Sequence, residues 1–297
     1  MDKNKIEEIK KGKNIKELLE FSIINIDKSS GPTSFNVSDF VRKNLNLRKT
    51  SHFGTLDPKV TGVLPIALNR ACKLTGYFLG EDKEYIGIMR FHEEIKKEKV
   101  EEMIGKKFLG KILQTPPLKS RVKREERTRE IKEFEILEVK EKDFLFRVVC
   151  QGGTYIRKLV DDLGKELKIN AHMLELRRTR AGIIKENDLE YSSIRLYDFE
   201  EAVNEYKKGN EEQIRKILIP GEIVSLLHRE VQIKNSEVKK ILTGKPIYTD
   251  DLKNKKEKFE KGEIVISFSD KKFLGIHKVT KEKEIFARPE FVFQENI

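Results

Sequence analysis

The sequence contains no tryptophan, two cysteines in 297 residues and no long apolar run. Cys72 and Cys150 are far apart and form no Cys-x-x-Cys pair, so a disulfide framework and a thiol-based zinc site are both disfavoured. No apolar stretch reaches the roughly 18 residues that a membrane span requires. Residues 1–20 are of mixed charge and lack the apolar stretch of a secretory signal. We therefore expect a soluble protein of the cytoplasm.

The histidines also lack the spacing that is typical of metal ligands. None of the five histidines stands in a His-x-x-x-His arrangement. We expect neither a structural metal nor thiol catalysis.

Charge is plentiful and unbalanced. The chain has 61 basic and 50 acidic residues, which gives a formal net charge of +11. The two signs are interspersed, and 37% of the residues are hydrophobic, so a folded protein with a real core is expected rather than a disordered one. The basic surplus suggests a polyanionic partner. Nucleic acid ranks ahead of a membrane surface because no basic amphipathic anchor is present.

The hydrophobic pattern of the first 220 residues mixes strands with helices. Residues 84–91 alternate as in a strand, and residues 134–139 and 144–150 flank a turn as in a β-hairpin. Residues 154–167 carry one apolar helical face. Ser34 can cap another helix. Interleaved strands and helices, partly joined by hairpins, predict an α+β fold.

The pattern changes near residues 226–230. Short alternating runs follow, separated by a lysine-rich stretch over residues 253–261, and they predict a small β module. The N-terminal residues have a modest helical pattern and no assigned role. We therefore divide the chain into an extension, a larger α+β domain and the small module, at residues 1–20, 21–228 and 229–297.

The most unusual segment is Lys49 to Ala67, which holds two glycines, two prolines and several hydroxyl groups before an apolar run. Pro58 constrains Asp57 toward extended geometry and can present its carboxylate rigidly. Leu-Asp-Pro is also a common turn former, and a lone histidine such as His52 is more often structural than catalytic. The residues alone predict an ordered loop that is a candidate active site.

This segment closely resembles the catalytic motif of the TruB/dyskerin family of RNA pseudouridine synthases. The family signature is matched by His52, Gly54, Thr55, Leu56, Asp57, Pro58, Thr61 and Gly62. Four more family motifs are resembled in the same order, by Asp27-Lys28 with Gly31, by Lys83-Glu84-Tyr85, by Gly153 to Arg157 and by Leu176-Arg177-Arg178. The resemblance extends over residues 21–293.

The resemblance implies a pseudouridine synthase catalytic domain with a mixed, largely antiparallel sheet and flanking helices. It also implies that the tail is a small, β-barrel-like PUA domain that binds RNA. Gly244, just past a short helix of this module, is the candidate RNA contact there. One departure is that Ser29 stands where the family usually has a proline.

The implied activity is the isomerisation of uridine to pseudouridine, in which the glycosidic bond breaks and the base rejoins through carbon. This reaction needs no cofactor. The resemblance makes Asp57 the catalytic carboxylate, ionised and beside the flipped uridine. Attack on the base, attack on the sugar and abstraction of a sugar proton all remain open.

Other site residues follow from the same resemblance. Arg177 is expected to pair with Asp57, because a guanidinium beside a carboxylate fixes its orientation. Tyr85 is expected to stack on the target base, and His52 to position the RNA. Lys28 and Tyr155 are further candidate substrate-binding residues.

A basic stretch over residues 118–132 occupies the place of the family's substrate-gripping loop. Such a run is usually a solvated face. In the context of the family, its candidate RNA phosphate contacts are Lys119, Arg121, Lys123 and Arg124.

The resemblance favours the catalytic subunit of an archaeal H/ACA ribonucleoprotein. The sequence Pro-Lys-Val-Thr-Gly at residues 58–62 is typical of the archaeal and eukaryotic branch. The chain also ends soon after the PUA-like module, as expected for an archaeal member. The expected partners are a guide RNA, ribosomal or transfer RNA substrate, and three small proteins (zinc-ribbon-like, glycine/arginine-type and kink-turn-binding). The alternatives are a stand-alone transfer RNA enzyme and a non-catalytic RNA-binding scaffold. The combination of Asp57, Tyr85 and Arg177 argues against the scaffold.

Overall fold

The computed structural model describes residues 2–116, 123, 125–280 and 282–294. Its chain divides into two compact units. The larger unit is Leu19–Ile219, and the smaller one combines Met1–Leu18 with Pro220–Ile297. The sequence analysis set residues 1–20 apart, whereas nearly all of them group here with the carboxyl-terminal residues. No helix in the described ranges is long and apolar enough to cross a lipid bilayer.

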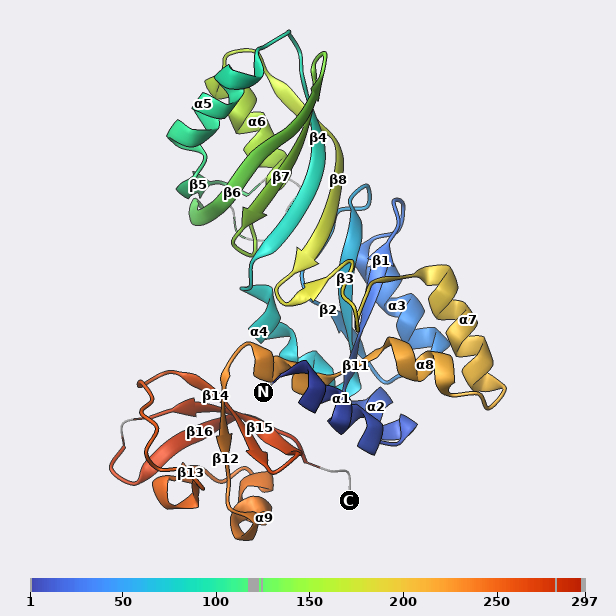
Figure 1. The fold of residues 1–297 in the computed structure, drawn as a ribbon, viewed down its shortest axis with the longest axis vertical. Helices are drawn as coiled ribbons and strands as arrows, with labels where there is room; N and C mark the ends of the chain where they lie inside the picture. The colour runs from blue at the N-terminus through green and yellow to red at the C-terminus, as the bar shows by residue number, and fades with distance from the viewer. Residues whose placement is uncertain (1, 117–122, 124, 281, 295–297) are drawn as a thin grey trace. The chain divides into compact units, whose positions relative to one another are not determined.

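A mixed sheet organises the larger unit (Figure 1). Eleven strands of the described residues pair in the order β10-β1-β3-β8-β4-β7-β6-β5, with β11 beside β1, β2 beside β3 and β9 beside β8. Their bounds are β1 Ser22–Lys28, β2 Thr50–His52, β3 Thr61–Leu68, β4 Lys83–Phe91, β5 Gly110–Gln114, β6 Arg127–Lys140, β7 Asp143–Cys150, β8 Ala171–Ala181, β9 Ile184–Lys185, β10 Ile194–Arg195 and β11 Leu218–Pro220. The α+β prediction is confirmed.

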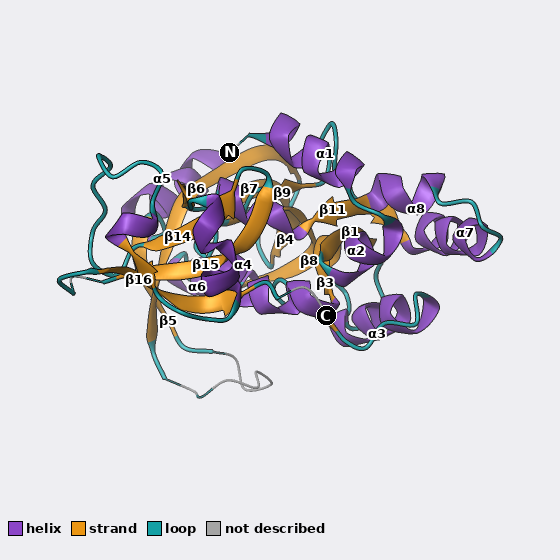
Figure 2. Ribbon diagram, turned by 90° about the horizontal axis from the view of Figure 1, so that it is seen from below, coloured by secondary structure: helices purple, strands orange, loops and turns teal. Residues whose placement is uncertain are grey.

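Helices cover this sheet. They are α3 Ser34–Asn44, η1 Asn69–Leu74, α4 Thr75–Leu79, α5 Lys97–Lys107, α6 Ile156–Glu166, α7 Leu196–Lys207 and α8 Glu212–Ile217. Helices α3 and α7 lie side by side, with the rings of Phe40 and Phe199 edge to face at 6.1 Å (Figures 1 and 2). The cap of α3 is Thr33 and not Ser34 as predicted. Ser34 is already the first helical residue, and its hydroxyl binds elsewhere.

The sheet consists of two well-paired halves. Strands β1 and β3 run antiparallel from Ile23↔Ala67 to Lys28↔Gly62. Strand β4 is antiparallel to both β7 and β8 along its whole length. The predicted strand at 84–91, the hairpin after it and the helix over 154–167 correspond to β4, β6–β7 and α6.

A short parallel seam joins the two halves. Strands β3 and β8 pair only at Thr61↔Arg177 and Gly62↔Arg178. Gly62 has a positive φ of 99°, and a Cβ there would lie 2.2 Å from the carbonyl oxygen of Arg178. Only glycine therefore permits the two strands to approach so closely.

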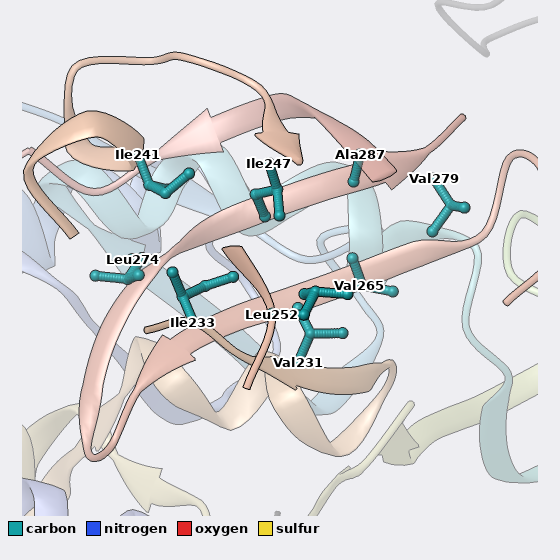
Figure 3. Packing of buried hydrophobic residues seen from close by; sticks show 9 residues of the cluster. All are labelled: Val231, Ile233, Ile241, Ile247, Leu252, Val265, Leu274, Val279 and Ala287. Atoms are coloured by element: carbon teal, nitrogen blue, oxygen red, sulfur yellow. The ribbon is translucent and has the colours of Figure 1, made fainter. Parts of the chain in front are cut away.

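The smaller unit contains a five-stranded sheet in the order β12-β14-β15-β16-β13. Nine buried apolar side chains form its core, among them Ile233, Val265 and Leu274 (Figure 3). Its elements, and the two N-terminal helices, are α1 Lys3–Gly12, α2 Ile15–Glu20, η2 Gly221–Leu226, β12 Arg229–Gln232, η3 Asn235–Glu237, α9 Val238–Leu242, β13 Ile247–Tyr248, η4 Thr249–Asp251, β14 Ile264–Ser269, β15 Lys272–Val279 and β16 Ile285–Val292.

Candidate active site

Asp57 lies between β2 and β3 on a segment whose backbone is bound by side chains from elsewhere. The buried hydroxyl of Ser34 donates to the carbonyl oxygen of Leu56 at 3.0 Å and accepts from the Leu56 N–H at 2.8 Å. On the other side, the Val60 N–H donates to the Asp57 carbonyl oxygen at 3.0 Å. The segment is thus fixed on both sides of the carboxylate.

Lys28 is the main support of this segment. Its ammonium group donates to the carbonyl oxygens of Ser29 and Pro58 at 2.9 Å and of Val60 at 2.8 Å. The residue is fully buried. Burial lowers the pKa of Lys28, and the negative charge of Asp57 opposes that shift. The sequence analysis named Lys28 as a substrate contact, but here its three donor positions are used by the protein backbone.

The Asp57 carboxylate pairs with Arg157. The Arg157 Nη2 lies 3.0 Å from Asp57 Oδ2, and the two side chains are 58% and 47% exposed. The described residues place no other hydrogen-bonding side chain on this carboxylate, so Oδ1 is open to an incoming molecule. An acid with one oxygen bound and one free is oriented and still reactive.

The predicted pair of Asp57 with Arg177 is wrong. The Arg177 guanidinium binds both carboxylate oxygens of Asp27, at 2.9 and 2.8 Å, and its Nε donates to Glu186 at 3.0 Å. The hydrogen bond to Asp27 raises the pKa of Arg177 further. Residue 177 lies beside β3 at Thr61, where its side chain reaches the end of β1 rather than the Asp57 segment.

Tyr85 and Arg178 form a buried layer in the same region. Tyr85 is almost fully buried, and burial raises the pKa of its phenol. The positive charge of Arg178 opposes this shift, and burial lowers the pKa of Arg178 itself. Arg178 also donates to the carbonyl oxygens of Val63 at 2.8 Å and Gly54 at 3.1 Å. Arg178 therefore bridges Gly54 and Val63, which lie on either side of Asp57 in the chain.

Lys83 adds a second buried cation. It donates to the carbonyl oxygens of Phe78 at 3.0 Å and Glu81 at 2.6 Å. Burial lowers its pKa to about 8, and the charge of Arg178 acts in the same direction. Burial raises the pKa of the neighbouring Cys150 thiol to about 12, so this cysteine is protonated at neutral pH.

The remaining two site candidates lie at the edges of this group. The His52 Nε2 is 3.2 Å from the Thr55 hydroxyl, and burial lowers the pKa of the imidazole. Tyr155 is half-buried and directly precedes α6, two residues before Arg157. Both residues are in the same unit as Asp57, and their predicted contacts with RNA stay predictions.

Most of the predicted RNA phosphate contacts cannot be placed. Lys119, Arg121 and Arg124 lie outside the described residues. Lys123 is exposed and forms an ion pair with Glu125. In the smaller unit, Gly244 is exposed and ends α9 with a positive φ of 85°.

Arg157 belongs to one of the predicted motifs, Gly153 to Arg157, but no role is predicted for it. A usable signal existed, because Arg157 falls outside the apolar face of α6 and follows the Gly152-Gly153 turn closely. The supporting contacts of Ser34 and Arg178 are not predicted either. Their partners are backbone groups far away in the chain, and no local pattern encodes such contacts.

Three protein-family models match most of the chain. Residues 42–156 match the model described as TruB family pseudouridylate synthase (N terminal domain). Residues 157–225 match the tRNA pseudouridylate synthase B C-terminal domain, and residues 231–288 match a PUA-like domain.

Archaeal relatives are similar over most of their length. A protein of Methanocaldococcus jannaschii, named Probable tRNA pseudouridine synthase B, is 43% identical over 85% of this chain and 74% of its own. A protein of the same name from Nanoarchaeum equitans is 41% identical over 84% of this chain and 71% of its own.

Solved structures are similar over nearly the whole chain. A chain from the crystal structure of a Cbf5-Nop10-Gar1 complex has a TM-score of 0.87 and 35% identity, and covers 96% of this chain and 88% of that one. A chain from an H/ACA RNP bound to a substrate RNA containing 2'-deoxyuridine has a TM-score of 0.86 and 33% identity, with coverage of 96% and 89%.

Proposed function

Since this chain belongs to the TruB family of pseudouridylate synthases, we propose that Asp57 is the catalytic carboxylate with which it isomerises uridine in RNA. The observation that carries this proposal is the Asp57–Arg157 pair. It presents one carboxylate oxygen bound and the other open, on a segment held by Lys28 and Ser34. Such a fixed, accessible acid suits a reaction that takes place on a base outside the helical stack.

The chemistry requires only groups of this kind. The bond between N1 of the base and C1′ of the sugar breaks, the base turns, and a bond from C5 to C1′ replaces it. The proton on C5 leaves and N1 gains one, so the reaction is balanced without oxidant, reductant or energy source. Asp57 acts while the glycosidic bond is broken, and Arg157 holds its orientation. Tyr85 and Arg178 are the buried aromatic and basic groups of the same region.

We further propose that the chain works as the catalytic subunit of an H/ACA ribonucleoprotein. Its similarity to a chain of the Cbf5-Nop10-Gar1 complex supports this, because the similarity covers 96% of the chain, which also carries the PUA-like domain. The proposed partners are a guide RNA that selects the uridine, and three small proteins, zinc-ribbon-like, glycine/arginine-type and kink-turn-binding. Because the named relatives are archaeal, the proposed location is the cytoplasm.

A second candidate is stand-alone action on transfer RNA. The name of the Methanocaldococcus jannaschii relative, tRNA pseudouridine synthase B, favours it. The two candidates share one site and one chemistry. They differ in whether the protein or a guide RNA selects the target.

One assay separates them. The purified chain would be given a transfer RNA T-loop substrate alone, and then a target RNA with an H/ACA guide and the three partner proteins. Conversion of labelled uridine to pseudouridine is the readout. Activity only in the guided mixture supports the ribonucleoprotein subunit, whereas activity on transfer RNA alone supports stand-alone action.

The control is Asp57→Asn, which keeps the size of the side chain and removes its charge. We expect no detectable turnover and RNA binding within about threefold of the wild type. Turnover by this variant would overturn the assignment of Asp57. RNA binding by the wild type without turnover in either mixture would favour a non-catalytic scaffold.

A further inference from the structure

The exposed Asp57–Arg157 ion pair needs other contacts to hold its two side chains in position. Both side chains are about half exposed, and an exposed ion pair contributes little free energy by itself. Such a pair cannot fix its own geometry. The position of Arg157 must therefore come from the backbone on which it stands, which is the first turn of α6 and the loop before it.

That backbone lacks the usual cap. Tyr155 occupies the N-cap position of α6 and makes no side-chain capping hydrogen bond. The preceding residues form a tight turn in which Gly153 has a positive φ of 85° and the Thr154 hydroxyl donates to the Gln151 carbonyl oxygen at 2.7 Å. Helix starts without a cap tend to fray, and a helix end that must hold a functional side chain needs another anchor.

Gln114, the last residue of β5, provides this anchor. Its amide oxygen accepts from the Tyr155 N–H at 3.0 Å, and its amide nitrogen donates to the Tyr155 carbonyl oxygen at 3.2 Å. One side-chain amide thus satisfies both backbone groups of one residue, as a neighbouring strand would. Gln114 is only 3% exposed, so water does not compete for these bonds.

Arg129 on β6 provides a second contact with the same turn. Its Nε donates to the Gly153 carbonyl oxygen at 3.1 Å. The guanidinium lies against the glycine, with Nη2 only 3.2 Å from where a Cβ would be. Strands β5 and β6 are paired, with Gln114 opposite Arg127, so both contacts come from one hairpin.

We infer that Gln114 is a positioning residue for the isomerisation, because it fixes the residue two positions before Arg157 and so sets where Arg157 meets Asp57. Arg129 assists from the adjacent strand. This inference rests on the proposed function of Asp57. A displacement of about 1 Å in a catalytic group can cost on the order of a hundredfold in rate, so the loss of such an anchor is measurable.

The experiment replaces Gln114 by methionine, which has similar length and flexibility but cannot form either hydrogen bond. We expect kcat to fall about 10- to 100-fold while KM for the RNA changes less than about threefold. The matched control is Gln151→Met. Gln151 is exposed in the same turn, and the described residues give its side chain no hydrogen bond. Its kcat should equal that of the wild type.

A double-mutant cycle tests whether the loss of kcat in Gln114→Met arises through Arg157. If Gln114 acts through Arg157, then Gln114→Met should cost nothing further in an Arg157→Gln background. A full multiplicative loss in the double variant would overturn the inference, since Gln114 would then act elsewhere. Wild-type kcat in Gln114→Met would also overturn it.

Folding is checked by thermal unfolding of each variant. If Gln114→Met does not fold, Arg129→Lys replaces it, because this substitution keeps the charge of a half-buried side chain and removes the Nε donor. We then expect kcat to fall about three- to tenfold at unchanged KM, and an unchanged kcat would overturn the inference. Failure of the proposed function looks different, because Asp57→Asn would then remain active.

Discussion

The two members of the central ion pair are held in opposite ways. Asp57 stands on a segment whose supports are buried side chains of the same half of the sheet, chiefly Lys28 and Ser34. Arg157 stands at a helix start whose support comes from a hairpin, through Gln114. The backbone around Asp57 is held by buried side chains, whereas Arg157 depends on one contact from a separate hairpin. The difference suggests that removing a support of Asp57 costs both stability and activity, whereas removing the exposed Arg157 side chain itself costs activity alone.

The largest expected effect separates the two arginines. Arg157→Gln should lower kcat about 10²- to 10³-fold, the usual cost of removing one charged group that orients a reacting one, and should leave the free energy of unfolding nearly unchanged. Steady-state kinetics and urea unfolding measure the two quantities.

The matched comparison is Arg177→Gln. This change leaves Asp27 and Glu186 without their guanidinium, so we expect a loss of about 1–3 kcal/mol in stability and less than tenfold in kcat. The reverse ranking of the two variants in kcat would restore Arg177 as the partner of the catalytic acid.

Lys28→Met tests the acid side. It removes the Lys28 donor from the carbonyl oxygen of buried Val60 and from that of Pro58, which keeps only the Gly31 N–H, and we expect a cost of about 1–3 kcal/mol in stability. The Asp57 segment then loosens, and kcat should fall about 10- to 100-fold. Lys59→Met is the control, because Lys59 is an exposed lysine of the same segment. Equal losses in both variants would mean that the charge, and not the buried contacts, matters.

Lys83 gives a pH-dependent prediction for the same side. Its pKa is about 8 in the folded chain and near 10.5 when unfolded, so between these values the unfolded state binds the extra proton. Stability therefore rises with pH in this window, relative to Lys83→Met, by up to about 3 kcal/mol. Urea unfolding of both proteins from pH 7 to 11 measures the difference. A difference that stays constant across the window would show that Lys83 titrates normally.

The smallest expected effect concerns two buried serines of α3. Ser34→Ala removes both contacts with Leu56 and should cost about 1–2 kcal/mol and about threefold in kcat. Ser38→Ala removes a bond to Thr50 at 2.9 Å, away from the Asp57 segment. It should destabilise comparably without changing kcat. A similar kcat loss in both would mean that general loosening of α3 explains the effect.

The same contrast explains what could be predicted from the sequence. The motif at residues 49–67 predicts Asp57 as the candidate acid, since all its determinants are neighbours in the chain, and the 3.6-residue and two-residue periods locate α6 and β4. The partner of Asp57 was assigned to Arg177, although Arg157 occupied a motif of equal standing. Which arginine reaches the acid depends on the seam between β3 and β8, and hydrophobic periodicity carries no information about how strands from distant segments pair.

The pairing of β3 with β8 also has a consequence for the newly synthesised chain. Asp57 belongs to the half of the sheet built on β1 and β3, and Arg157 to the half that carries α6 on β8. Two register pairs, made possible by Gly62, bring the halves together. A newly synthesised chain with only one half folded would hold an acid without its arginine, or the reverse. Competence for chemistry therefore requires both halves to be folded and joined, so a chain with only one folded half would not catalyse the isomerisation.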